Sequence, residues 1–234
     1  MPRPLRPIDE GLVYHVINRG NNRQRVLAKK GDFEAFLATL LELKERKRFK
    51  LYGYCLLDNH FHLLIRPSGA SISRIMQSVL VSHTHRYHKR HRSAGHVWQG
   101  RFKSPVIQND EHLLTVLRYI EANPLRAKIV ERAEEYPWSS YPHHGAGQAD
   151  ELVDRLILYE ELSARPAARQ RKWAEKVHRP IEEQALAAIR RASATGRPYG
   201  NPVWVERLAK KLDLDLTIRP RGRPRKVPVA KNLK

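Results

Sequence analysis

Apolar residues in the first half of the chain follow two kinds of spacing, which together predict an order of strands and helices. Short β-branched, aromatic and aliphatic runs predict strands, and apolar residues at helical spacing behind Asp32 and Ser71 predict helices. The predicted strands cover residues 12–18, 50–57, 60–66 and 104–108. The predicted helices cover residues 32–43, 71–92 and 109–123. The order β-α-β-β-α-β, followed by a third helix, predicts an α+β protein with the ferredoxin-like arrangement.

The chain changes character near residue 145, where we place the end of the first domain. Residues 160–191 are polar and have a helical pattern, and residues 203–212 predict a further short helix. Residues 219–226 are basic and rich in proline and glycine, so we expect this tail to be disordered when free. The predicted parts are a core domain over 1–145, a helical extension over 146–216 and a basic tail over 217–234.

The charge balance narrows the class of partner. Lysine and arginine number 44 against 24 acidic residues, which gives a formal net charge of +20. An excess of this size is self-repulsive unless a polyanion binds it, and nucleic acid is the first candidate. We expect no membrane partner, because no apolar run approaches the roughly 18–20 residues that span a bilayer. The single cysteine, Cys55, excludes an intrachain disulfide, and we expect a cytoplasmic, nucleoid-associated protein.

Two histidines lie two residues apart on the third predicted strand. Side chains alternate between the faces of a strand, so His60 and His62 project from one face while Phe61 projects from the other. Two imidazoles on one face of a rigid hairpin are suited to binding a divalent metal. The alternative is that both histidines only line a solvated face of the sheet.

A tyrosine and an asparagine follow on the last predicted helix of the core. Tyr119 and Asn123 are four residues apart and therefore share one helix face. If this helix crosses the sheet, it brings a phenol and an amide oxygen to the two histidines. Alternatively, Tyr119 covers the edge of the core and Asn123 caps the helix before Pro124. The spacing alone leaves both interpretations open.

Several short motifs in a fixed order resemble one known family. The motifs are Asn18-Arg19-Gly20-Asn21-Asn22-Arg23, Asp58-Asn59-His60-Phe61-His62, Trp98-Gln99-Gly100-Arg101-Phe102-Lys103, Tyr119-Ile120-x-x-Asn123-Pro124 and Tyr136-Pro137-Trp138-Ser139-Ser140-Tyr141. In this order they resemble the single-tyrosine HUH transposases, and within these the REP-associated tyrosine transposases. The resemblance covers roughly residues 8–145.

The resemblance implies a ferredoxin-like catalytic domain that uses Mg²⁺ or Mn²⁺. It implies that Tyr119 is the nucleophile, that His60 and His62 are metal ligands, and that Asn123 is the third ligand. Many members of the superfamily have glutamine at the last position, and asparagine supplies the same amide oxygen on a shorter arm. The implied product is a 5′-phosphotyrosine with a free 3′-OH. Such a link conserves the phosphodiester energy, and the chain has no Gly-rich phosphate loop, so we expect no nucleotide cofactor.

Basic and amide side chains outside this quartet are candidates for contacts to single-stranded or hairpin DNA. We predict DNA-binding roles for Asn18, Arg19, Arg23, Arg86, Arg101, Lys103, Arg223 and Arg225. The alternatives are a polar turn around Asn18, core packing of Trp98 and Phe102, and a generic basic tail after residue 217. Four histidines at 83, 85, 88 and 91 favour a basic surface over a second metal site.

These features together predict a metal-dependent endonuclease and strand transferase that acts on palindromic or hairpin DNA. One rival is a catalytically inactive DNA-binding protein of the same fold with a regulatory or structural role. A second rival is a nuclease that uses water, in which Tyr119 is structural. We expect a monomer rather than a homodimer.

Overall fold

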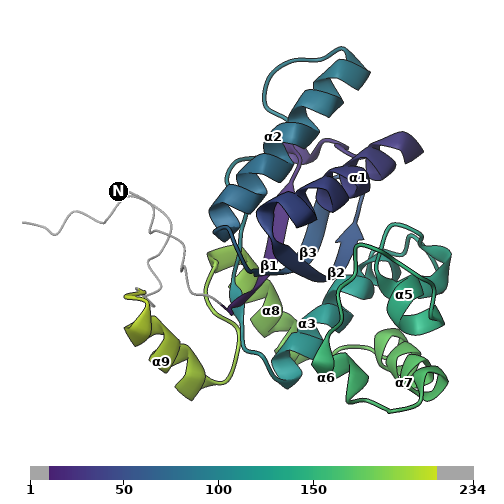
Figure 1. The fold of residues 1–234 in the computed structure, drawn as a ribbon, viewed down its shortest axis with the longest axis vertical. Helices are drawn as coiled ribbons and strands as arrows, with labels where there is room; N and C mark the ends of the chain where they lie inside the picture. Colours follow the sequence, from purple (N-terminus) through teal and green to yellow (C-terminus); the bar gives the residue numbers. More distant parts are fainter. Residues whose placement is uncertain (1–10, 215–234) are drawn as a thin grey trace, which may run out of the picture.

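A four-stranded antiparallel sheet forms the centre of the molecule in the computed structural model, which describes residues 11–214 (Figure 1). The strands are β1 Val13–Arg19, β2 Phe49–Leu56, β3 His60–Pro67 and β4 Val106–Ile107. They are ordered β2-β3-β1-β4, and every neighbouring pair is antiparallel. This order confirms the ferredoxin-like arrangement predicted from the sequence.

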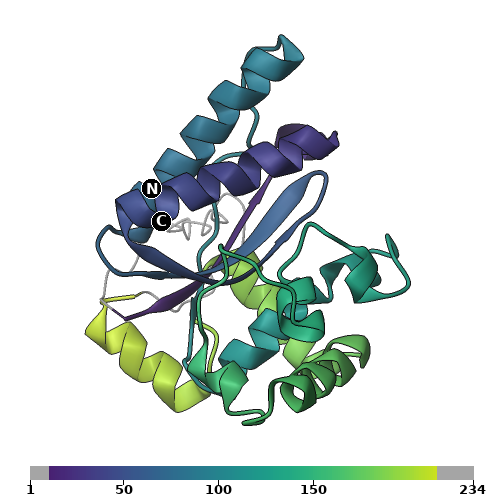
Figure 2. The same cartoon turned by 45° about the vertical axis from the view of Figure 1, so that its right-hand side comes forward.

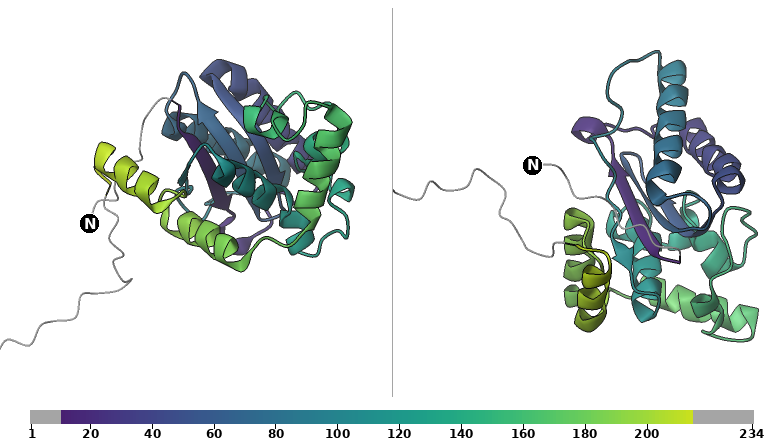
Figure 3. Two further views of the ribbon diagram at one scale, coloured as in Figure 1. Left: turned by 90° about the horizontal axis from the view of Figure 1, so that it is seen from below. Right: turned by 60° about the vertical axis from the view of Figure 1, so that its left-hand side comes forward.

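Three long helices cover the two faces of the sheet. They are α1 Lys30–Lys47, α2 Ile72–His91 and α3 Glu111–Glu121. Helices α1 and α2 lie side by side on one face (Figure 2), and α3 crosses the opposite face (Figure 3). Ser71 and Asp110 each accept a backbone N–H in the first turn of the helix that follows, so α2 and α3 begin where side-chain caps replace missing intrahelical acceptors.

Alternation along β3 assigns its side chains to two separate cores. Phe61, Leu63 and Ile65 pack beneath α1 and α2. Leu64 belongs to the second core, beneath α3, and His62 lies on the same face. The predicted separation of the histidines from Phe61 is therefore confirmed, and the histidine face is the one that α3 covers.

Three predicted elements differ from those in the structure. The helix predicted to reach residue 123 ends at Glu121, and a short turn, α4 Asn123–Arg126, follows because Pro124 has no N–H to donate to Ile120. The helix predicted over 160–191 is two helices, separated near Pro180. The fourth strand has two residues instead of five, because Pro105 cannot donate to the ladder.

The second half of the chain wraps around the face that carries α3. Its helices are α5 Tyr141–Ala146, α6 Ile157–Glu160, α7 Pro166–His178, α8 Glu183–Thr195 and α9 Pro202–Lys211, with 3₁₀ turns at Asn21–Arg23 and Ala133–Glu135 elsewhere. Tyr141, Tyr159 and Trp173 share one hydrophobic core with α3. Residues on both sides of position 145 therefore stabilise the same core.

Segments of the second half also cover both edges of the sheet. Beside β2, the N–H of Leu56 donates to the carbonyl of Trp138 (2.8 Å). Beside β4, the N–H of Tyr199 donates to the carbonyl of Val106 (2.8 Å), and Gln108 donates to Tyr199 in return (2.9 Å). These bonds satisfy edge groups that would otherwise offer a template for pairing with another chain. Across residues 11–214, every helix is too short or too polar to pass through a bilayer.

Candidate active site

The register of β1 against β3 gathers polar side chains on the face beneath α3. Ile17 lies opposite His62, and Arg19 lies opposite His60. Side chains at opposed positions share a face, and so do residues two apart, so His15 joins this group from β1. His15 is fully buried, and the sequence analysis did not select it. The sequence places His15 two residues before Ile17, but that spacing indicates the histidine face only once the pairing of Ile17 with His62 is known.

The two predicted metal ligands have matching hydrogen bonds. His60 Nδ1 lies 2.6 Å from Asn59 Oδ1, and His62 Nδ1 lies 2.9 Å from His15 Nε2. Within residues 11–214, neither Nε2 atom of His60 or His62 makes a hydrogen bond to the protein. Both Nε2 atoms therefore have the freedom that a metal ligand requires.

The surroundings keep both imidazoles neutral. Burial, together with the charges of Arg19 and Arg126, lowers the pKa of His60 to about 4. Burial, and the neighbouring His15 and His60, hold the pKa of His62 well below its usual value. Because only neutral imidazole can donate a lone pair to a cation, this donor pair fits a divalent metal at neutral pH.

Tyr119 reaches the histidines from α3. Its ring centroid lies 5.8 Å from those of both His15 and His62, with the rings edge to face, and the residue is 6% exposed. The Arg126 guanidinium stands over the Tyr119 ring, 4.2 Å from the centroid. The structure thus brings together the predicted nucleophile and one predicted ligand, and it adds Arg126, which sequence reasoning missed because α4 was not predicted.

Asn123 closes the end of the tyrosine helix. Its Nδ2 donates to the carbonyls of Tyr119 (2.9 Å) and Ile120 (3.1 Å), so it supplies the hydrogen bond that Pro124 cannot make. Its Oδ1 accepts from Arg126 (3.3 Å). These contacts are those of a helix cap, which was one of the two interpretations that the sequence left open. The role of Asn123 as a third metal ligand stays a prediction.

Gly53 on β2 sets how closely α3 approaches the sheet. A Cβ atom at this position would overlap Leu117 Cδ1 and lie 3.0 Å from Ser140 Oγ. We expect Gly53→Ala to destabilise the fold by about 1–3 kcal/mol, because the added methyl group must push α3 away from a packed core. Urea unfolding measures this change. The double variant Gly53→Ala/Leu117→Val should lose less than the sum of the two single changes, and strict additivity would contradict the contact.

The predicted DNA-binding residues occupy several different environments. Residues 97–103 pair with the end of β1 through Gln99 N–H to Arg19 O (2.9 Å) and a bridge between Ile17 and Lys103. This pairing brings exposed basic side chains to one edge of the histidine face. They are Arg19, opposite His60, and Lys103, opposite Ile17; Arg23 and Arg101 are exposed in the adjoining segments. Asn18 is buried and donates to the carbonyl of Gly100 (3.4 Å).

The remaining basic candidates lie elsewhere. Arg86, on α2, pairs with Glu42 of α1 at 3.2 Å, on the helices that cover the other face. Arg223 and Arg225 lie outside the described residues. Trp98 and Phe102 pack into the core, where the Trp98 ring contacts Phe61 and His83 at centroid distances of 5.4 and 5.0 Å.

The four histidines at 83, 85, 88 and 91 do not point to one common site. His83 is buried, His88 bonds to Ser93, and His91 pairs with Asp32 of α1 at 3.1 Å, while His85 is exposed. Burial lowers the pKa of His83 to about 4. The hydrogen-bond and ion-pair partners of these histidines differ, so the segment forms a basic surface in which His83 is buried.

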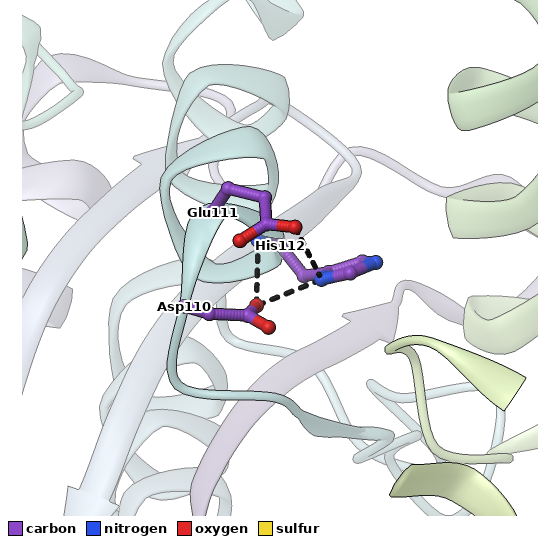
Figure 4. Close-up of side chains that lie close together, drawn as sticks. All are labelled: Asp110, Glu111 and His112. Atoms are coloured by element: carbon purple, nitrogen blue, oxygen red, sulfur yellow. Dashed lines mark hydrogen bonds and ion pairs between the residues drawn. The ribbon is translucent and has the colours of Figure 1, made fainter. Parts of the chain in front are cut away.

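Asp110, Glu111 and His112 lie close together at the start of α3 (Figure 4). Asp110 Oδ1 accepts the His112 N–H at 2.9 Å and lies 2.7 Å from the His112 ring Nδ1. Glu111 is 82% exposed and 3.9 Å from that nitrogen. Three such donors can hold a cation, but the hydrogen bonds of Asp110 already account for its position as the helix cap, and we assign no function to the group.

Comparisons with known proteins agree with this geometry. Residues 9–123 match the family described as "Transposase IS200 like". A putative REP-associated tyrosine transposase of Haemophilus influenzae is 28% identical over 109 residues, which cover 42% of this chain and 61% of that protein. The chain thus spans less than two thirds of the length of this relative.

A solved structure has the same fold. It is described as a REP-associated tyrosine transposase bound to a REP hairpin, and it matches 66% of this chain and 94% of its own with a TM-score of 0.53. At 19% identity this likeness shows the fold alone. The matched family covers the whole sheet, the paired histidines and the tyrosine helix. Residues 9–123 of this chain therefore belong to the IS200-like transposase family.

Proposed function

We propose that this protein cuts and rejoins DNA strands through a covalent bond to Tyr119. The observation that carries the proposal is the position of the Tyr119 ring, whose edge-to-face contacts with His15 and His62 place a phenol at the paired histidines. A protein that only binds DNA has no need to bury a tyrosine against His62, a neutral imidazole whose Nε2 makes no hydrogen bond among the described residues.

The proposed reaction is a displacement at phosphorus. The Tyr119 oxygen attacks a DNA phosphate, the P–O3′ bond breaks, and the proton of the phenol is balanced by the proton gained at the leaving 3′ oxygen. A Mg²⁺ or Mn²⁺ ion held by His60 and His62 would polarise a phosphoryl oxygen and stabilise the charge that develops there. The 5′-phosphotyrosine keeps the energy of the broken bond, so a second 3′-OH can reverse the step without ATP.

Two arginines are suited to orienting the phosphate. Arg19 and Arg126 both lie near enough to His60 and His62 for their charges to lower the pKa of each imidazole. The same positive field favours a phosphodiester over a neutral substrate. We propose that Arg126 also holds the Tyr119 ring in place, since its guanidinium covers the ring face.

We propose single-stranded or hairpin DNA as the substrate. Support comes from the net charge of +20 and from exposed basic residues, namely Arg19 and Lys103 on the histidine face and Arg23 and Arg101 in the adjoining segments. The related solved structure is bound to a REP hairpin. The monomeric state and the nucleoid location stay predictions.

Metal dependence and adduct formation test the proposal in one assay. Hairpin oligonucleotides with single-stranded flanks, incubated with Mn²⁺, are expected to yield an adduct that survives SDS, and EDTA should abolish it. Gel electrophoresis of a labelled oligonucleotide measures both the adduct and the nick. Tight binding without cleavage under any divalent ion would support the DNA-binding rival, and cleavage without an adduct would support the water-using nuclease.

A further inference from the structure

We infer that His15 is a positioning residue whose Nε2 accepts the Nδ1 proton of His62, which leaves His62 Nε2 free to bind a divalent ion. This inference rests on the proposed function only in placing that ion at His60 and His62. His15 is fully buried on β1, and its Nε2 lies 2.9 Å from His62 Nδ1. The two rings are stacked, with centroids 5.1 Å apart and planes 25° apart.

One proton lies between these two nitrogens, and its place has a chemical consequence. If His62 Nδ1 carries it and donates to His15, His62 Nε2 has a free lone pair. If His15 Nε2 carries it and donates to His62, the His62 proton is at Nε2, where it blocks a cation. A hydrogen bond of the same length is formed in both cases, so distance alone does not choose between them.

His60 provides an internal comparison. Its Nδ1 faces Asn59 Oδ1 at 2.6 Å, and an amide oxygen can only accept, so His60 has its proton on Nδ1 and its lone pair on Nε2. His62 can match His60 only if His15 also accepts. His15 must then carry its own proton on Nδ1, which is buried and has no hydrogen-bond partner among the described residues.

Because His15 Nδ1 has no partner among the described residues, the tautomers of His15 and His62 can change when a ligand binds His62. No partner of His15 Nδ1 in residues 11–214 holds His15 in either tautomer, so a ligand on His62 Nε2 decides the matter for both rings. A divalent ion at Nε2 requires the Nδ1–H form of His62, which requires His15 to accept. His15 also contacts the edge of the Tyr119 ring, so the tautomer pair lies directly against the proposed nucleophile.

Metal affinity of the full-length protein without DNA tests the inference. We expect His15→Phe, which cannot accept a hydrogen bond, to weaken Mn²⁺ binding by about 10–100-fold, the usual effect of removing a partner of a ligating histidine. His15→Gln, whose side-chain oxygen can accept near the position of Nε2, should restore most of the affinity. His85→Gln, at an exposed histidine on α2, should leave it unchanged. Electron paramagnetic resonance of free Mn²⁺ gives the affinities.

A spectroscopic measurement on the unaltered protein keeps the inference open to failure even if His15→Phe does not fold. Two-bond ¹H–¹⁵N spectra report which imidazole nitrogen carries a proton. With saturating Mg²⁺, we expect protons on Nδ1 of both His15 and His62. A proton on His62 Nε2 under these conditions, unchanged Mn²⁺ affinity in His15→Phe, or no His62-dependent Mn²⁺ binding would each overturn the inference.

The inference and the proposed function can fail separately. DNA cleavage that depends on Tyr119, combined with normal Mn²⁺ affinity in His15→Phe, would leave the function standing and remove the role of His15. If the protein shows the expected tautomers and affinity losses but forms no DNA adduct, the role of His15 stands and the proposed function fails.

Discussion

Replacing Tyr119 by phenylalanine is expected to abolish the covalent DNA adduct and to slow strand cleavage by at least about 10⁴-fold, the scale of loss when a nucleophile is removed. The change deletes one oxygen atom. The ring keeps its contacts with His15, His62 and the Arg126 guanidinium, so the site should retain its shape. Single-turnover cleavage of a labelled hairpin measures the rate.

DNA binding separates this result from misfolding. Tyr119→Phe should bind the same hairpin within about twofold of the unaltered protein in EDTA, because a buried hydroxyl contributes little to a phosphate-dominated affinity. Tyr199→Phe is the matched control: this tyrosine is also buried, but it lies beside β4 and His112, and it should form the adduct normally. Cleavage at the normal rate by Tyr119→Phe would mean that water is the nucleophile.

The second large effect is expected from Glu121, two residues after Tyr119 on α3. Its side chain is fully buried, and its Oε1 lies 2.5 Å from Ser140 Oγ and 2.6 Å from His144 Nδ1. Its Oε2 accepts from Trp173 Nε1 at 2.7 Å. Glu121→Ala leaves these three groups buried without their partner, and we expect a loss of about 3–5 kcal/mol in the free energy of unfolding.

Chemical denaturation with a matched control checks this value. Glu111→Ala removes a carboxylate from the same helix, but that side chain is 82% exposed, so its effect should stay below about 1 kcal/mol. Trp173→Phe removes only one donor and should couple to Glu121→Ala, with the double variant losing less than the sum. A loss under about 1 kcal/mol for Glu121→Ala would show that this network does not hold α3.

The Glu121 network ties the tyrosine helix to the second half of the chain. Ser140 is the N-cap residue of α5, His144 lies within α5, and Trp173 lies on α7. The match to the family ends at residue 123, so these partners lie beyond the matched segment. The position of Tyr119 over the histidines therefore depends on residues beyond the segment that matches the family.

Local patterns were sufficient for most of the fold. Strand alternation placed His60 and His62 opposite Phe61, because neighbouring side chains of a strand must point to opposite faces. The element order predicted the sheet order, because few topologies connect such elements by short crossovers. The errors came where proline acts: Pro124 ends α3 early, and Pro180 divides one predicted helix into two.

The sequence by itself determined which residues are candidates for the proposed chemistry, since two histidines, a tyrosine and an asparagine stand at spacings that strand and helix periods turn into shared faces. Only the tertiary structure decided that His15 bonds to His62, that Arg126 covers Tyr119, and that Gly53 lets α3 approach the sheet. The physical reason is that these contacts join residues far apart in the chain. Strand register and helix docking depend on how whole faces pack together, which no local period encodes.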